Sequence, residues 1–118
     1  MTVLRIVANI AVAYPDRARR FYRDFLDLEV AMDHGWILTF ASGGQQQAPQ
    51  VSFATEGGSG TPVPDLSVEV DDIDAVHARA QQMGIEIVYP IADEPWGVRR
   101  FYVRDPFGKI VNVLSHVR

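Results

Sequence analysis

Polar and apolar residues alternate in the first part of the chain, in the stretch VLRIVANIAV at residues 3–12. Alternate residues of a strand point to opposite faces of a sheet, so the pattern predicts a half-buried strand whose buried face carries Ile6, Ala8, Ile10 and Val12. Pro15 suits the first turn of a helix. Apolar residues then recur at spacings of three and four, as on the covered face of a helix: Ala18, Phe21, Tyr22, Phe25 and Leu26. Strand patterns follow near residues 28–32, 36–41 and 50–55, with a loop at 42–49.

The same order of elements begins again after EGGSGTPVP, residues 56–64, which has the composition of a linker. Residues 65–70 alternate and predict a strand. Asp71 or Asp72 then caps a helix, and Gly84 ends it in the left-handed conformation. The apolar stripe of this helix consists of Ile73, Val76, Ala80 and Met83. Three more strands are predicted near residues 85–88, 99–104 and 109–114, the last two joined by a type I turn at 105–108.

This repetition predicts an α+β fold of two βαβββ modules. The modules cover about residues 1–56 and 65–118, with a linker at 57–64, and the 118 residues fit one domain. One helix cannot cover both faces of four strands. We therefore expect the modules to form a curved mixed sheet, a cup with the helices outside and a ligand inside.

The composition removes several classes of function. A net charge of −4 offers no attraction to nucleic acid or to an anionic membrane. The absence of cysteine excludes disulfides, thiolate nucleophiles and cysteine-ligated zinc. No apolar run approaches the roughly 20 residues of a membrane helix, and the start of the chain lacks a signal-peptide cleavage site. We therefore expect a cytoplasmic protein.

Three phrases carry a resemblance to a known family: RRFYRDFLDLEV, VDDIDAVHARAQQMGIEI and EPWGVRRFYVRDPFGKIVNVLSH. With their spacing they resemble the vicinal oxygen chelate superfamily, which includes glyoxalase I, bleomycin-resistance proteins and extradiol dioxygenases. The resemblance implies the glyoxalase/bleomycin-resistance fold over nearly the whole chain. Family helices often end in Leu-Gly where this chain has Leu26-Asp27, but Asp tolerates the left-handed conformation.

The resemblance also locates the places where metal enzymes of the superfamily carry their ligands. These places hold Val7, Ser52, Asp65 and Asn112. The family usually has His in place of Asp65 and Glu in place of Asn112. Zinc, nickel and iron ions prefer imidazole and carboxylate ligands, and only Asp65 is charged here. We therefore expect no metal and no cofactor, with magnesium or calcium on Asp65 and Asn112 as the alternative.

The residues expected to face a ligand in the cup are Val7, Asn9, Ser52, Asp65, Glu69, Trp96, Phe101 and Asn112. A hairpin turning at 105–108 would place Phe101 opposite Asn112. Asp65 and Glu69 are four strand residues apart, about 13 Å, too far to act as a carboxylate pair. Either could be a general base if burial raised its pKa.

The three histidines do not supply the missing metal ligands. His34 lies in a predicted turn, and His77 is expected to be a half-buried structural residue on its helix. His116 shares the strand face of Asn112 and Leu114 and could reach a ligand, although a histidine in such a place is more often only solvated.

Three functions remain open. The first is a metal-free binder of small molecules, which resembles the bleomycin-resistance proteins that sequester a drug. The second is a lyase, isomerase or dioxygenase using Asp65, Glu69 or an unusual metal site. The third is a ligand-sensing or interaction subunit. The substituted ligand places favour the first over a metal enzyme, but nothing in the sequence separates a binder from a metal-free enzyme. The open edge of the cup, and the resemblance, predict a homodimer.

Overall fold

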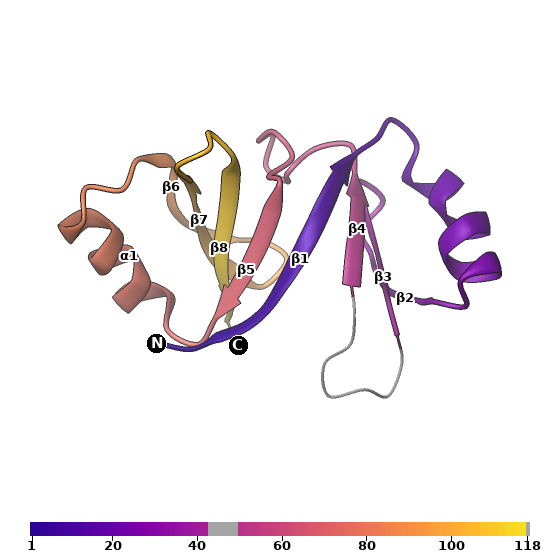
Figure 1. Ribbon diagram of the computed structural model, residues 1–118, viewed down its shortest axis with the longest axis horizontal. Helices are drawn as coiled ribbons and strands as arrows, with labels where there is room; N and C mark the ends of the chain where they lie inside the picture. Colours follow the sequence, from indigo (N-terminus) through magenta and orange to yellow (C-terminus); the bar gives the residue numbers. More distant parts are fainter. Residues whose placement is uncertain (43–49, 118) are drawn as a thin grey trace. The chain divides into compact units, whose positions relative to one another are not determined.

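The computed structural model describes residues 1–42 and 50–117 of the chain (Figure 1). Its elements, in order, are β1 (Val3–Ala11), the short helices η1 (Pro15–Ala18) and η2 (Arg20–Phe25), β2 (Glu29–Asp33), β3 (Ile37–Ala41), β4 (Gln50–Ala54), β5 (Leu66–Val70), α1 (Ile73–Gln82), β6 (Ile87–Glu94), β7 (Val98–Arg104) and β8 (Ile110–His116). This order confirms the repeated strand, helix and three strands. The predicted loop at 42–49 lies, apart from Ser42, outside the described residues.

Hydrogen bonds join the eight strands in the order β2-β3-β4-β1-β5-β8-β7-β6. Two pairs in this order, β1 with β4 and β5 with β8, are parallel. The predicted α+β class with a mixed sheet is therefore confirmed. The chain divides into an N-terminal unit, Val7–Val63, and a C-terminal unit, Met1–Ile6 with Pro64–Arg118. The strand β1 contributes residues to both units. No helix among the described residues is long and apolar enough to cross a membrane.

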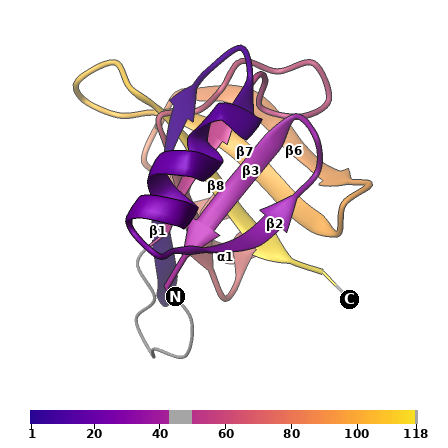
Figure 2. The same cartoon turned by 90° about the vertical axis from the view of Figure 1, so that its right-hand side faces the viewer.

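The core of the N-terminal unit lies between the short helices and the strands β3 and β4 (Figure 2). Leu38, Phe40 and Phe53 are buried there, and Tyr22 packs on them with its ring 4.7 Å from that of Phe53. This face is covered because alternate apolar residues of β3 and β4 point to the same side.

The first helical segment differs from the predicted α-helix. It is a 3₁₀ helix followed by a π-helix, in which Leu26 N–H donates to Phe21 O at 3.0 Å. The wider turn breaks the alignment of residues three and four apart. Ala18 and Tyr22 pack on the core as predicted, whereas Phe21, Phe25 and Leu26 are exposed, Phe25 by 71%. Asp27 has the expected left-handed conformation, with φ of 61°.

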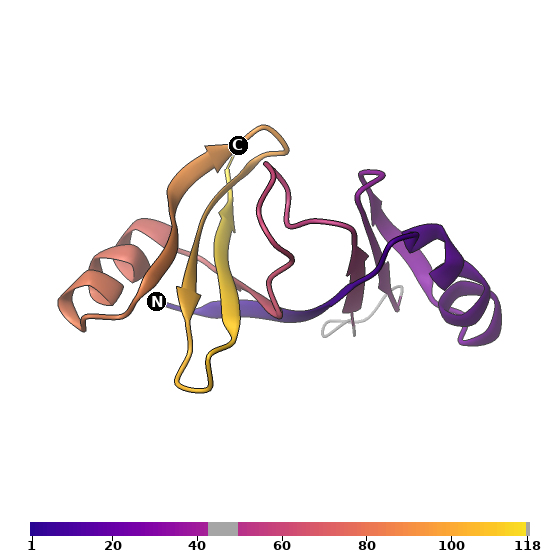
Figure 3. The same cartoon turned by 90° about the horizontal axis from the view of Figure 1, so that it is seen from above.

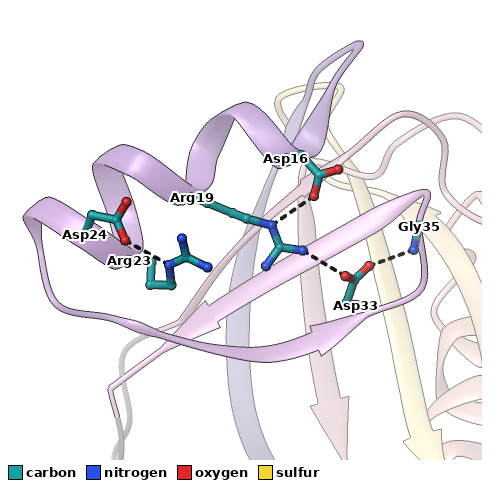
Figure 4. A network of polar contacts seen from close by, with 6 residues as sticks. All are labelled: Asp16, Arg19, Arg23, Asp24, Asp33 and Gly35. Atoms are coloured by element: carbon teal, nitrogen blue, oxygen red, sulfur yellow. Dashed lines mark hydrogen bonds and ion pairs between the residues drawn. The ribbon is translucent and has the colours of Figure 1, made fainter.

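Arg19 connects this helical segment to the β2–β3 hairpin (Figure 4). Its Nε and Nη2 donate to Asp16 Oδ1 and Asp33 Oδ2, each at 2.9 Å. Asp33 also accepts a hydrogen bond from the backbone N–H of Gly35. That bond, with Arg19, lowers the pKa of Asp33 despite some desolvation. Arg19 therefore has a structural role, because it joins the helical segment to β2.

The C-terminal unit packs α1 against β7 and β8 (Figure 3). Val70, Phe101 and Val113 form its core with Ile73 and Ala80 of the helix. The caps are as predicted, since Asp72 Oδ1 accepts from Ala75 N–H at 3.1 Å and Gly84 has φ of 66°.

Two further details of α1 bear on the sequence predictions. His77 is half-buried, with its ring edge-on to Phe101 at 5.0 Å, which confirms its structural role. Met83 belongs to the C-terminal cap and is exposed, so its predicted place in the apolar stripe is wrong.

The predicted register of the β7–β8 hairpin is wrong by one residue. Phe101 pairs with Val113, and Asn112 pairs with Tyr102. The turn contains one residue more than expected, because Gly108, with φ of 79°, adds a left-handed position after the type I turn. Hairpins of this kind combine a type I turn with a glycine bulge.

The predicted burial of one face of the first strand is wrong for Ile6, Ala8 and Ile10, whereas Val12 packs on the core of the N-terminal unit as predicted. Leu4, Ile6 and Ile10 lie on this face and are exposed, Ile6 by 60%. The main helix contacts explain the difference, because η1 packs on β3 and β4 whereas α1 packs on β7 and β8. The helices thus leave this face of β1 open to solvent.

Candidate functional site

In the N-terminal unit the predicted site residues lie on the sheet face opposite the helices. Val7 and Ser52 are buried, and Asn9 is the partner of Ser52 across the parallel β1–β4 pair. On the other side of Ser52, β3 places Thr39, whose Oγ1 lies 2.7 Å from Ser52 Oγ. Sequence analysis missed Thr39, although a polar residue inside the apolar run ILTFA was a signal for it. The polar groups on this face of the N-terminal unit are therefore neutral.

In the C-terminal unit, three strands place Ser67, Asn112 and Tyr102 in one row on the face opposite α1. Asn112 is only 7% exposed, and its Nδ2 donates to Ser67 Oγ at 3.1 Å. Among the described residues, no group donates a hydrogen bond to Asn112 Oδ1. A buried amide oxygen without a partner is uncommon in native proteins and calls for an explanation.

The next row on the same face contains Glu69, whose two carboxylate oxygens have different partners. Arg5 Nε donates to Glu69 Oε1 at 2.5 Å, and His116 Nδ1 lies 2.9 Å from Glu69 Oε2. Burial alone would raise the pKa of Glu69, but the hydrogen bonds from His116 and Arg5 outweigh it and the pKa is lowered. The condition under which Glu69 was expected to act as a general base, a raised pKa, is therefore not met.

The other sequence-predicted residues have different environments. Asp65 is exposed, and its Oδ2 accepts a hydrogen bond from Ile110 N–H at 2.9 Å, at the beginning of the β5–β8 pair. Phe101 is fully buried in the core beneath α1 and does not meet Asn112. Trp96 is half-buried and lies over the guanidinium of Arg100.

Arg100 is the centre of a cluster that sequence analysis missed, the Arg100 cluster, on β6, β7 and the turn between them. Its Nη2 lies 2.8 Å from Glu94 Oε2, and both side chains are almost fully buried. Arg100 Nη1 donates to the Tyr102 hydroxyl at 3.0 Å, and the Tyr89 hydroxyl donates to Glu94 Oε1 at 3.2 Å. The rings of Tyr89, Trp96 and Tyr102 surround the guanidinium, with centroids 4.9–5.2 Å from Cζ.

A signal for this pair was present in the sequence. The turn at 95–97 pairs Glu94 with Val98, so Glu94 and Arg100 become diagonal neighbours on one face. A glutamate and an arginine at this offset across a hairpin predict an ion pair. The burial of Glu94 and Arg100 depends on the three aromatic rings around the guanidinium, and the sequence separation of the two residues did not predict it.

The residues at the family's four ligand places do not fit a transition metal. Val7 has no donor atom, and the hydroxyl of Ser52 is hydrogen-bonded to Thr39. Asp65 carries the one charge and already accepts a backbone hydrogen bond. Over residues 1–42 and 50–117, no group of three His, Cys, Asp or Glu side chains could hold a metal ion. The donors at these places are thus mainly neutral oxygens, which suit zinc, nickel or iron poorly.

Comparison with known proteins identifies a family for the chain. A family model described as a glyoxalase-like domain matches residues 2–118. No curated protein matches the sequence.

Solved structures share the fold at low sequence identity. A methylmalonyl-CoA epimerase variant from Streptomyces coelicolor, in complex with 2-nitronate-propionyl-CoA, has a TM-score of 0.73 and 17% identity, over 99% of this chain and 100% of the other. A protein described as an NAD-dependent benzaldehyde dehydrogenase from Legionella pneumophila has a TM-score of 0.73 and 17% identity, over 95% and 99%. A glyoxalase/bleomycin resistance protein/dioxygenase superfamily member from Vibrio splendidus 12B01 has a TM-score of 0.66 and 18% identity, over 97% and 99%. At these identities the similarity concerns the fold.

Proposed function

Because the chain belongs to the family of glyoxalase-like domains, we propose that it binds an organic small molecule without a transition metal. The ligand lies on the polar face of the C-terminal unit, against Asn112 and Ser67. The observation that carries this proposal is the buried Oδ1 of Asn112, which lacks a donor among the described residues. A buried oxygen left unpaired lowers stability by about 1–3 kcal/mol, and a ligand N–H or O–H would remove that penalty.

The ligand class follows from the groups on this face. Asn112 and Ser67 offer hydrogen bonds, and Leu114 offers an apolar contact. A partly apolar molecule with at least one N–H or O–H donor fits this combination. The Streptomyces neighbour binds a propionyl-CoA derivative, which supports an acyl or other organic ligand here. If the ligand is a drug, the protein would sequester it as the bleomycin-resistance proteins do.

Native mass spectrometry of protein purified without a histidine tag tests the proposal. We expect an adduct of a small organic molecule on wild-type protein, lost in Asn112→Ala and kept in Gln81→Ala, an amide removed from the exposed surface of α1. An adduct that survives Asn112→Ala would contradict the assigned place. Wild-type protein that carries no adduct and shows no mass shift with a library of acyl thioesters and aromatic drugs would contradict the function.

The absence of a transition metal is tested separately, by elemental analysis and by titration with nickel, zinc, manganese and ferrous ions. We expect no stoichiometric binding, because neutral oxygens lose hydration without the attraction of opposite charge. Stoichiometric metal lost in Asp65→Ala would overturn this part. The combined variant Val7→His, Ser52→Glu, Asp65→His and Asn112→Glu restores family-type ligands and should gain metal binding.

A second candidate function is a metal-free lyase or isomerase. It is favoured by the contact between Glu69, ionised at neutral pH, and His116. A carboxylate that orients an imidazole is a common arrangement for proton transfer. Turnover of a carbon acid by the purified protein would place this function ahead of simple binding.

We also propose that the protein is a homodimer. The open face of β1 in the C-terminal unit, with Leu4 and Ile6, supports a second copy as its occupant. A two-fold axis across this face would set the same apolar residues of the two copies against each other, as in isologous dimers.

A further inference from the structure

Three strands of the C-terminal unit bring together residues that are far apart in the sequence. Arg5 lies on β1, Glu69 on β5 and His116 on β8, with separations of 64 residues between Arg5 and Glu69 and 47 between Glu69 and His116. We propose that this triad is a proton-transfer centre, in which His116 is the base and Glu69 and Arg5 position it. The inference rests on the second candidate function above.

The hydrogen bonds determine which imidazole nitrogen can accept a proton. An ionised carboxylate only accepts hydrogen bonds, so the contact of 2.9 Å between Glu69 Oε2 and His116 Nδ1 requires a proton on Nδ1. In the neutral ring, Nε2 then has its lone pair available. Arg5 binds the other oxygen, Oε1, and thereby keeps Oε2 directed at the imidazole.

The exposures of the two side chains suit this division of roles. The side chain of Glu69 is 16% exposed, whereas that of His116 is 54% exposed. The positioning group is sheltered and the base is accessible to a substrate. On β7, the residue opposite His116 is the apolar Val98. Among the described residues, the charged side chain recorded in contact with the imidazole is Glu69, which also binds Arg5. The other two histidines are placed differently, because His34 stacks on Trp36 and His77 meets Phe101.

The reaction class is proton transfer at a carbon next to a carbonyl group. His116 Nε2 takes the proton, the C–H electrons move to the carbonyl oxygen to form an enolate, and the imidazolium returns a proton to carbon. Glu69 stabilises the imidazolium during this step, as a carboxylate does beside a histidine base. The product is an isomer or epimer of the substrate, and no oxidant, reductant or co-reactant is needed.

Two measurements test the inference, and the first needs no substrate. Nitrogen-15 NMR of the three histidines reports the tautomer of each neutral ring. We expect Nδ1–H for His116 in the wild type and a mixture of tautomers in Glu69→Gln, with His34 and His77 unchanged. Nε2–H in wild-type His116 would overturn the positioning by Glu69, whatever the protein binds.

The second measurement is deuterium incorporation from D₂O, with methylmalonyl-CoA and dihydroxyacetone as probes of different size. We expect exchange of at least one probe to fall by about 10²–10⁴-fold in His116→Gln, the usual contribution of a general base. Glu69→Gln should shift the pH profile of exchange to lower pH, because removing the carboxylate destabilises the imidazolium. His34→Gln is the matched control and should exchange like the wild type.

The outcomes separate the two functions. If wild-type protein exchanges neither probe, or if His116→Gln exchanges as fast as the wild type, proton transfer by His116 is wrong. The adduct on Asn112 is measured independently, so binding can stand when proton transfer fails. Wild-type protein that carries no adduct but shows His116-dependent exchange would instead contradict the binding proposal and leave the proton-transfer centre in place.

Discussion

Asn112 and Glu69 lie on the same face of the C-terminal unit, yet their polar atoms are paired differently. Both oxygens of Glu69 have partners, His116 and Arg5, and these hold its pKa below the usual value. Asn112 uses its NH₂ group on Ser67 and leaves its buried oxygen without a donor among the described residues. A buried amide oxygen that lowers the stability of the fold is more consistent with a role in binding than with a role in folding.

Replacing both members of the Asn112–Ser67 pair tests this interpretation. We expect Ser67→Ala with Asn112→Leu to unfold at a free energy within about 1 kcal/mol of the wild type or above it, because both ends of the hydrogen bond and the unpaired amide oxygen are removed together. Chemical denaturation measures the change. Asn112→Ala is the comparison and should be destabilised through the cavity it leaves. A loss of more than about 3 kcal/mol in the double variant would indicate that the pair serves the fold.

Glu69 predicts a pH dependence of stability. Its pKa is lowered in the folded state, so its stabilisation is complete above the unfolded pKa of about 4.3 and is lost as the pH falls through the folded value. We expect Glu69→Gln to be less stable than the wild type at pH 6, and the difference to shrink as the pH falls from 5 toward 3. Urea denaturation at a series of pH values checks this. A difference that stays constant with pH would contradict the prediction.

At the scale of elements, two similar turns determine which residues meet on the C-terminal unit. Gly97 and Gly108 have φ of 90° and 79°, and each adds a left-handed residue to its hairpin. Because side chains alternate along a strand, one extra residue in a turn exchanges the faces of the paired strand. The turn at Gly108 thus places Tyr102, and not Phe101, beside Asn112.

The Glu94–Arg100 pair is the strongest candidate for a structural role at this scale. Removing one member of a buried ion pair leaves the other charge uncompensated, so we expect Arg100→Met to lower the free energy of unfolding by about 3–5 kcal/mol. Glu94→Leu together with Arg100→Met should recover most of that loss. Thermal and chemical denaturation measure both variants. If the double variant is as unstable as the single one, the pair contributes through a contact other than charge.

At the scale of the whole molecule, the order strand, helix and three strands occurs twice, and the two helical segments differ in type. In the N-terminal unit the helical segment is a 3₁₀ helix followed by a π-helix, and Arg19 ties it to β2. In the C-terminal unit the helix is regular and capped at both ends. Neither helix has its main contacts on β1, so apolar residues of that strand remain exposed. This exposed face is the basis of the proposed dimer.

Substitutions on the exposed face of β1 test the proposed dimer. We expect the wild type to scatter light as a particle of about twice the 13.2 kDa chain mass at micromolar concentration. Ile6→Glu should scatter as a monomer, because a two-fold interface would bring two copies of the new charge together. Phe107→Glu is the matched control, since Phe107 is equally apolar and 85% exposed but lies on the β7–β8 turn. A monomeric wild type, or dimers in all three proteins, would contradict the proposed interface.

The sequence by itself determined the features that depend on neighbouring residues. Alternation predicted the strands, and Asp72 and Gly84 predicted the ends of α1, because capping acts within three or four positions. The repeat of these local signals was sufficient for the fold class. The residue types at the four ligand places, one valine and three oxygen donors with a single charge, were likewise available from the sequence and its family resemblance.

Only the tertiary structure decided which side chains meet. In the triad of Arg5, Glu69 and His116, the bonded pairs are 64 and 47 positions apart in the sequence, and no local pattern specifies the strand pairings that bring them together. The row of Asn112 and Tyr102 depends on one left-handed glycine, and the burial of Arg100 depends on rings from two strands and a turn. Secondary structure follows from short-range sterics and hydrogen bonds. The site follows from register and from which faces the helices cover, and these are properties of the packed chain.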